Sequence, residues 1–163
     1  MPFTPFHFGP GVLLKALGPR WISLTAYVGS QIAIDLESGY HLFRGDWPVH
    51  RIAHTFPAAA FIGVVVGILV YLVGRNSSRS KDLVGKPANA AAPALAGGFI
   101  GGLSHPVLDG IMHTDIRPLL PFDSSNPFLG IVDLETLHLA CIGSGLLGGA
   151  ILGVRWVARN MAG

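Results

Sequence analysis

Three long stretches of the sequence are apolar and free of charge. Residues 56–74 and 87–104 contain no charged side chain and no histidine over 19 and 18 positions, and residues 139–154 add 16 more such positions. A helix needs about 20 mostly apolar residues to cross the hydrocarbon core of a bilayer. Each stretch therefore predicts a transmembrane helix. With their polar ends, the expected spans are about residues 51–74, 88–113 and 131–156.

The N-terminal part of the chain carries a shorter apolar pattern. Residues 21–34 are uncharged over 14 positions, and a short apolar segment precedes them before the turn signal Gly18-Pro19-Arg20. We therefore predict a short re-entrant helix over about residues 8–17 and a span over about 20–37, which returns the chain to the end where His7 lies. The expected fold class is all-α, an integral membrane four-helix bundle with a short N-terminal re-entrant helix, in one transmembrane domain over residues 1–163.

Composition favours a membrane protein over a soluble one. Apolar residues make up 50% of the 163-residue chain, charged residues only 12%, and the mean hydropathy is +0.53. A soluble domain usually carries about 25% charged residues, and one with half that share would leave large apolar patches in water. A soluble cytosolic domain, a disordered chain and a nucleic-acid binder are thereby excluded, so the expected partner is the lipid bilayer. The single cysteine, Cys141, excludes a zinc site built from several thiolates.

Lysine and arginine residues are divided unevenly between the two ends of the expected bundle. Eight of the eleven lie on the side of the loop over residues 75–87 and of the C-terminus, and Arg44, Arg51 and Arg117 lie on the other. Basic residues collect on the cytoplasmic side of membrane proteins. We therefore expect a multi-pass protein of a prokaryotic cytoplasmic (inner) membrane, with the loop over residues 75–87 in the cytoplasm and the opposite end facing outward.

Acidic and histidine residues collect at that outward end. All seven histidines and eight of the nine acidic residues fall there. The pairs His50/His54 and His105/Asp109 are spaced i, i+4, so each pair shares one helix face. Ionisable groups at membrane depth are costly and are kept mainly where they pair or bind something. The residues expected to hold a metal are His7, Asp35, His50, His54, His105, Asp109, His113 and His138.

Imidazole and carboxylate ligands without thiolate suit zinc, with manganese or iron as alternatives. The expected cofactor is therefore a divalent metal, zinc first, as one or two ions. For His41 an interfacial hydrogen-bonding role is favoured over metal binding, whereas His113 and His138 fit either role equally. The carboxylates that fit loop caps and turns better are Asp115, Asp123 and Asp133.

Glycines recur at four-residue spacing within the expected spans. The pairs are Gly63/Gly67, Gly97/Gly101, Gly98/Gly102, Gly145/Gly149 and Gly149/Gly153. Small residues at this spacing let helix backbones approach closely in lipid. We expect them to pack helices within one bundle, and an oligomer formed through the same Gly-rich helices is the alternative.

Five short elements between residues 4 and 124 carry a family resemblance. They are Thr4-Pro5-Phe6-His7, Ile34-Asp35-Leu36-Glu37, His50-Arg51-Ile52-Ala53-His54-Thr55, Ser104-His105-Pro106-Val107-Leu108-Asp109 and Leu119-Leu120-Pro121-Phe122-Asp123-Ser124. In this order they resemble the YdjM-like family of inner-membrane proteins, which are regarded as metal-dependent hydrolases. The fourth element is the most specific. The order of the ligands is also similar, more weakly, to that of zinc-dependent phospholipase C and P1-type nucleases, which act on phosphodiesters.

The ligand pattern and the resemblance together indicate a hydrolase. We expect a membrane-embedded, metal-dependent phosphoesterase that acts on a lipid or lipid-linked phosphate at the outward membrane boundary. Glu37 or Glu135 would orient or deprotonate the attacking water. Arg51 and Arg117, together with Asp123, would bind the substrate, since guanidinium groups neutralise phosphate.

Two other functions fit the same ligands. One is a metal-binding or metal-transport protein, and the other is a non-catalytic subunit of a larger membrane assembly. A transporter should carry polar residues through the bilayer midplane, yet residues 63–70, 94–100 and 145–152 carry none. Metal analysis would separate the subunit hypothesis from the other two.

Overall fold

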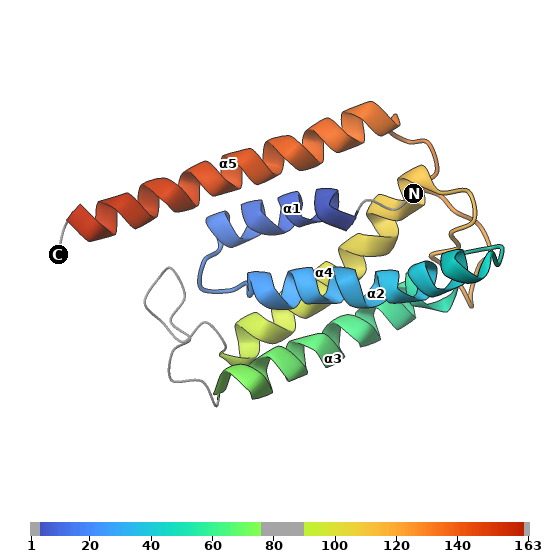
Figure 1. Ribbon diagram of the computed structural model, residues 1–163, viewed down its shortest axis with the longest axis horizontal. Helices are drawn as coiled ribbons and strands as arrows, with labels where there is room; N and C mark the ends of the chain where they lie inside the picture. The colour runs from blue at the N-terminus through green and yellow to red at the C-terminus, as the bar shows by residue number, and fades with distance from the viewer. Residues whose placement is uncertain (1–3, 76–89, 162–163) are drawn as a thin grey trace.

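The computed structural model describes residues 4–75 and 90–161, and these residues form helices and loops without a strand (Figure 1). The prediction of an all-α fold is confirmed. The helices are α1 (Thr4–Leu17), α2 (Leu24–Arg44), the 3-10 turn η1 (Ile52–His54), α3 (Phe56–Arg75), α4 (Ala91–Met112) and α5 (Leu134–Met161). Residues 76–87, most of the expected cytoplasmic loop, lie outside the described residues.

Successive helices run in alternating directions (Figure 1). The beginnings of α1, α3 and α5 therefore meet the ends of α2 and α4 at one end of the molecule, away from the C-terminus. Helix α4 packs along both α2 and α3, and α1 packs along α5. The motifs of the sequence fall in the halves of the helices nearest this shared end and in the loops that join them there.

The first two helices form the hairpin that the sequence predicts, with different ends. Helix α1 begins at Thr4 rather than at residue 8, and α2 continues to Arg44 rather than ending near residue 37. His41 and Arg44 in the last turn suit the negative end of a helix dipole and allow the helix to continue past the uncharged stretch. Gly45 then ends α2 in the left-handed conformation, with φ 71°.

Glycines bring α3 and α4 into backbone contact. A methyl group on Gly63 would collide with the carbonyl oxygen of Gly98, and one on Gly98 would collide with that of Gly63. These glycines thus serve packing within the bundle, as the four-residue spacing predicts. The α1–α5 contact is similar, since Gly148 lies against the backbone of Leu13 and Arg155 donates a hydrogen bond to the carbonyl of Ala16.

Two helices in the described part of the chain are long and apolar enough to cross a membrane, α3 and α5. Only 17% of the residues in the most apolar stretch of each are buried, and side chains such as Phe61 and Val154 are each 70% exposed. The core helix of a soluble protein would bury this face. Helices α2 and α4 are less apolar, and they carry charged and histidine side chains of the site. The expected four-span bundle is therefore not confirmed.

Candidate metal centre

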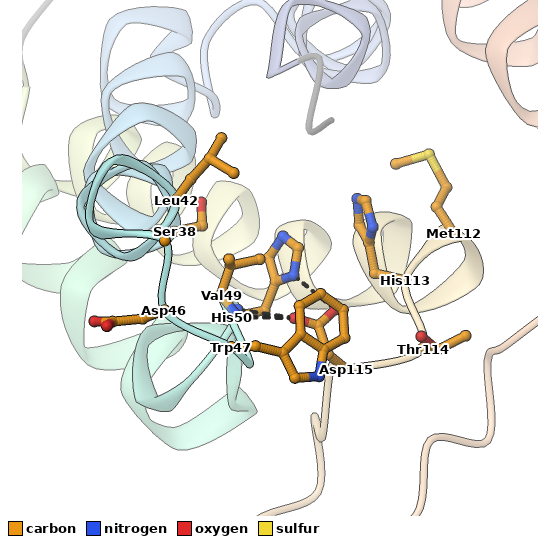
Figure 2. Close-up of a pocket in the computed structure, with 11 residues that line it drawn as sticks. Ser38, Leu42, Asp46, Trp47, Val49, His50, Met112, His113, Thr114 and Asp115 are labelled. Atoms are coloured by element: carbon orange, nitrogen blue, oxygen red, sulfur yellow. Dashed lines mark hydrogen bonds and ion pairs between the residues drawn. The ribbon is translucent and has the colours of Figure 1, made fainter.

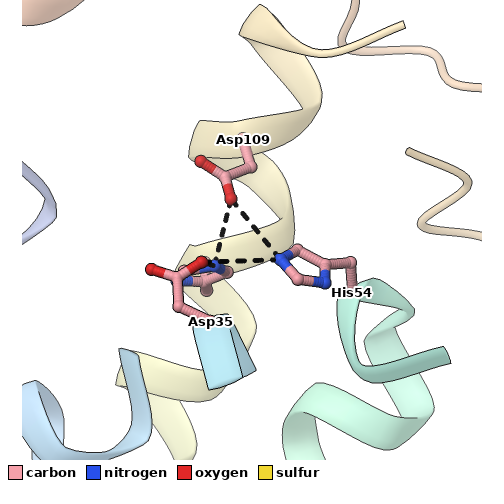
Figure 3. Close-up of side chains that lie close together, drawn as sticks. Asp35, His54 and Asp109 are labelled. Atoms are coloured by element: carbon pink, nitrogen blue, oxygen red, sulfur yellow. Dashed lines mark ion pairs between the residues drawn. The ribbon is translucent and has the colours of Figure 1, made fainter. Parts of the chain in front are cut away.

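Four side chains from three separate segments meet at the shared end of the bundle. Asp35 comes from α2, His54 from η1, and His105 and Asp109 from successive turns of α4 (Figure 3). One ligand atom of each lies within 4.8 Å of the others. The side chains of His54, His105 and Asp109 are fully buried, and that of Asp35 is 12% exposed.

The distances between these atoms suit ligands around a single ion. His105 Nε2 lies 3.0 Å from Asp109 Oδ2 and 3.3 Å from Asp35 Oδ1. His54 Nε2 lies 3.6 Å from Asp109 Oδ2 and 3.7 Å from Asp35 Oδ1. Ligand bonds of 2.0–2.1 Å in a tetrahedral site place neighbouring ligand atoms about 3.3 Å apart. The four atoms therefore need to move little to surround a divalent cation.

The other nitrogen of His105 is held by an amide. Its Nδ1 lies 2.5 Å from Gln31 Oε1, while Gln31 Nε2 donates to Gly101 O and to Ser104 Oγ, both at 3.0 Å. Because the amide nitrogen is the donor in those two bonds, Oε1 is the acceptor and Nδ1 of His105 carries the proton. Nε2 of the same ring then faces the two carboxylates.

Glu37 lies close to His54. Its Oε2 lies 3.5 Å from Nδ1 of His54 and accepts hydrogen bonds from the backbone N–H groups of Arg51 and Ala53, at 3.1 and 2.9 Å. Histidines that bind metals usually give their second nitrogen to such a partner, which orients the ring. The structure thus places Glu37 beside Nδ1 of His54, although the two atoms are too far apart for a hydrogen bond.

His7 reaches the same carboxylate from the first helix. Its Nε2 lies 3.2 Å from Asp109 Oδ1, on the opposite oxygen from the one that faces His54 and His105. The side chain is 2% exposed. The α1–α2 hairpin therefore brings the N-terminal histidine to the end of the bundle where Asp35 lies.

A second group adjoins the first and consists of His50, His113 and Asp115. Nδ1 of His50 lies 2.9 Å from Asp115 Oδ1, and Asp115 Oδ2 accepts the backbone N–H groups of Val49 and His50 at 3.0 and 3.2 Å. The His50 ring stacks on that of His113 at 4.4 Å and meets the edge of His54 at 4.7 Å between ring centroids. The two groups are therefore continuous.

Burial and hydrogen bonding set the charges of the His50–Asp115 pair. Burial, and the charge that His54 carries when protonated, lower the pKa of His50, although Asp115 opposes this. Burial raises the pKa of the Asp115 carboxyl, but hydrogen bonds from the His50 ring and from backbone N–H groups outweigh it, and that pKa lies below its ordinary value. Both shifts favour a neutral imidazole beside a carboxylate, and Nε2 of His50 makes no hydrogen bond.

Buried polar atoms without a hydrogen-bond partner are concentrated here. Among the described residues they are Nδ1 and Nε2 of His7, Nε2 of His50, Nδ1 and Nε2 of His54, Nε2 of His105, both carboxylate oxygens of Asp109, and Nε2 of His113. Native proteins leave few such atoms, and a cluster of them calls for a bound group. Nitrogen and carboxylate oxygen together are the donors that a divalent metal takes.

The model of the YdjM inner membrane protein family matches residues 11–162. The chain belongs to this family. The resemblance carried by the short motifs is thereby confirmed, and the family and the apolar helices α3 and α5 make this a membrane protein. No match to a curated protein or to a solved structure was found.

Other residues singled out in this YdjM-family sequence lie outside the two ligand groups. The ring of His138 stacks on Phe6 at 4.4 Å, and His41 Nδ1 lies 3.0 Å from Asp46 Oδ2, a hydrogen-bonding role as the sequence predicts. Glu135 is exposed in the first turn of α5. Asp133 accepts a hydrogen bond from the backbone N–H of Thr136 at 2.8 Å, as a cap does.

The residues expected to bind substrate are spread over the loops. Arg51 follows His50 directly, donates to Pro48 O at 2.9 Å and lies 3.9 Å from Asp46 Oδ2. Arg117 donates to the carbonyl of Ser124 at 2.5 Å, and Asp123 accepts from the backbone N–H of Ser125 at 2.7 Å. Arg51 is thus the only one of the three that is adjacent in sequence to a ligand residue.

Sequence reasoning missed Gln31 and gave Asp115 only a capping role. Gln31 lies one turn before Asp35 in α2, so the two share a helix face, and a glutamine within an otherwise apolar stretch was the signal. Asp115 does cap backbone N–H groups, as expected, but it also orients His50. That contact joins residues 65 positions apart, so no local pattern could show it.

A cavity of about 420 Å³ opens beside the second group (Figure 2). His50, His113 and Asp115 line one side of it, and the apolar side chains on its walls are those of Leu42, Trp47, Val49 and Met112. The cavity leads to the histidines from the loop between α2 and η1. It therefore offers a route by which a partly apolar molecule can reach the ligand groups.

Proposed function

We propose that this YdjM-family protein is a membrane-embedded, metal-dependent hydrolase of phosphoesters. The observation that carries the proposal is the buried group of Asp35, His54, His105 and Asp109, whose facing atoms lie 3.0–3.7 Å apart. Three segments of the chain supply these atoms, so the arrangement is a product of the fold. A purely structural network would instead satisfy its own donors and acceptors.

The four residues would hold one divalent ion through two imidazole nitrogens and two carboxylate oxygens. This donor set fits zinc, with manganese or iron as alternatives. Such an ion, when bound, lowers the pKa of a coordinated water and polarises a phosphoryl oxygen.

The protein supplies orientation and charge around that chemistry. Gln31 holds the ring of His105 so that Nε2 faces the carboxylates, and Glu37 places a negative charge beside Nδ1 of His54. Arg51 is the arginine that we expect to neutralise a phosphate group, since it directly follows His50, which lines the cavity. Arg117, Asp123 and Glu135 lie in loops or at the exposed start of α5, where a bulky substrate would meet them.

We further propose a lipid or lipid-linked phosphate as substrate and an outward-facing site in the inner membrane. Apolar walls beside the histidines suit a substrate with a hydrocarbon part. The excess of lysine and arginine around the opposite end of the bundle supports the orientation. In this arrangement the bilayer is both the surroundings of the protein and the source of its substrate.

The test uses the full chain purified in detergent. Bound metals are measured by mass spectrometry, and hydrolysis is measured on bis(p-nitrophenyl) phosphate and on mixed micelles that contain phosphatidic acid. His105→Ala and Asp109→Asn should lose metal and hydrolysis together. His41→Ala is the matched control, because its ring bonds to Asp46 outside both ligand groups, and it should keep both.

Each result has a distinct reading. Metal that persists in both ligand variants contradicts the assignment of the site. A metal that is bound without hydrolysis of either phosphoester indicates a metal-handling protein. A wild-type protein free of metal, which gains none on incubation with Zn²⁺, Mn²⁺ or Fe²⁺, indicates a non-catalytic subunit.

A further inference from the structure

The histidines of the second group are not used by the site described so far. His50 gives Nδ1 to Asp115, and its Nε2 is buried without a partner. Nε2 of His113 is likewise buried without a partner, on a ring that stacks against His50 at 4.4 Å. Two imidazoles therefore present free nitrogens in one place, and one of them is held there by a carboxylate in the manner of a metal ligand.

The carboxylate of Asp109 faces two sides. Its Oδ2 lies 3.0 Å from His105 Nε2 and 3.6 Å from His54 Nε2, whereas its Oδ1 lies 3.2 Å from His7 Nε2. His113 comes four residues after Asp109, directly after the last residue of α4. Both therefore lie on the same side of that helix. A carboxylate placed in this way can bind one ion through each oxygen, as in centres where two ions lie about 3.5–4 Å apart.

We propose that His50 and His113 hold a second divalent cation, which shares Asp109 with the first, so that the centre binds two ions. The donor set is two imidazole nitrogens and one carboxylate oxygen, a combination that suits zinc and leaves a position for water or substrate. This inference rests on the first ion of the proposed function. Asp115 is then a positioning residue, which orients His50 without touching the ion.

The position of the cavity assigns a task to the second ion. Its lining includes His50 and His113, so the second ion adjoins the space that a substrate would enter. A phosphate group there would lie between the ion and the apolar walls of Leu42, Trp47 and Met112. His50 and His113 would hold the second ion where it could polarise a phosphoryl oxygen, and the apolar walls would receive the hydrocarbon part of the substrate.

The experiment counts and characterises the ions. The full chain in detergent is stripped with a chelator and titrated with Co²⁺, which reports each binding event in its visible spectrum. Wild-type protein should take up two equivalents, and magnetic measurements should show the two ions coupled through the shared carboxylate. The double variant His50→Ala/His113→Ala should take up one equivalent with no coupling, and the control His41→Ala should take up two.

The outcomes separate this inference from the proposed function. One equivalent in both the wild type and the double variant overturns the second ion and leaves the first intact. No equivalent in the wild type overturns both. Two equivalents in the double variant also overturn the inference. If the double variant does not fold, the wild type alone decides, because two coupled ions support the inference and two uncoupled ions contradict it.

Discussion

Nδ1 of His105 lies 2.5 Å from Oε1 of Gln31, a residue 74 positions earlier in the chain. The Gln31 amide cannot turn freely, because its nitrogen donates to the Gly101 carbonyl and to the Ser104 hydroxyl. The ring of His105 is therefore fixed with Nε2 toward Asp35 and Asp109 whether or not an ion is present. An arrangement fixed in advance reduces the entropic cost of binding.

Removing the Gln31 acceptor should weaken metal binding. We expect Gln31→Leu to lower the affinity for Zn²⁺ about 10- to 100-fold, the usual effect of losing a group that orients a ligand. A competition titration against a chromophoric chelator measures this. Gln31→Glu keeps an acceptor at the same place and should stay closer to the wild-type affinity. An unchanged affinity in Gln31→Leu would show that the bond does not orient His105.

Replacing Asp115 should loosen the segment that carries His50. Asp115→Asn exchanges the carboxylate that accepts two backbone N–H groups and the His50 ring for a neutral amide. We expect a loss of about 1–3 kcal/mol in the free energy of unfolding, since buried donors lose a charged partner. Thermal unfolding of metal-free protein in detergent measures the change. Asp123→Asn, in an exposed turn, should stay within about 0.5 kcal/mol of the wild type.

Adding a methyl group between α3 and α4 should destabilise the bundle. In Gly98→Ala the new Cβ would collide with the carbonyl oxygen of Gly63 and lie 3.0 Å from the Gly67 nitrogen, so the helices must separate. Such overpacking costs about 1–3 kcal/mol. Gly149→Ala is the control, because a Cβ there meets nothing within 4 Å, and it should unfold at or above the wild-type temperature. Equal stability of both variants would contradict close backbone packing at Gly98.

Cysteine labelling tests the orientation of the site. In a Cys141→Ala background, Ser124→Cys lies in the loop at the ligand end and Asn160→Cys lies near the end of α5, and both positions are exposed. We expect a membrane-impermeant maleimide to label Ser124→Cys in intact cells and Asn160→Cys only after permeabilisation, because basic residues surround the second position. The reverse pattern would place the ligand groups in the cytoplasm.

The helices were predictable where one kind of signal dominated. The apolar stretch over residues 56–74 became α3 almost residue for residue, because nothing within it competes with a helix. Helix α2 runs to Arg44, past the expected end of the span near residue 37, because the polar residues after 37 remain helical. Membrane insertion of α2 and α4 stays a prediction. The histidine and carboxylate side chains of the site lower the mean hydropathy of these two helices.

The site was predictable where ligands share a helix face and less so where loops bring them together. The i, i+4 spacing of His105 and Asp109 was enough to predict that their side chains lie together, and both face the candidate metal centre. The pairing of His50 with His54 was expected on one helix, yet the chain forms a 3-10 turn there and the two rings turn to different neighbours. The partner of each ring lies far away in sequence, at Asp115 and at Glu37, and only the tertiary structure shows such contacts.

The packing of α1 on α5 has a consequence for biogenesis. Helix α1 lies along α5, and Arg155 of α5 donates a hydrogen bond to the carbonyl of Ala16 in α1. The helix that bears His7 therefore packs against the helix that is synthesised last. We therefore expect the helix that bears His7 to reach its full set of packing contacts only when translation has passed Arg155. Metal loading should thus follow completion of the polypeptide, and a nascent chain arrested before α5 should bind its metal weakly.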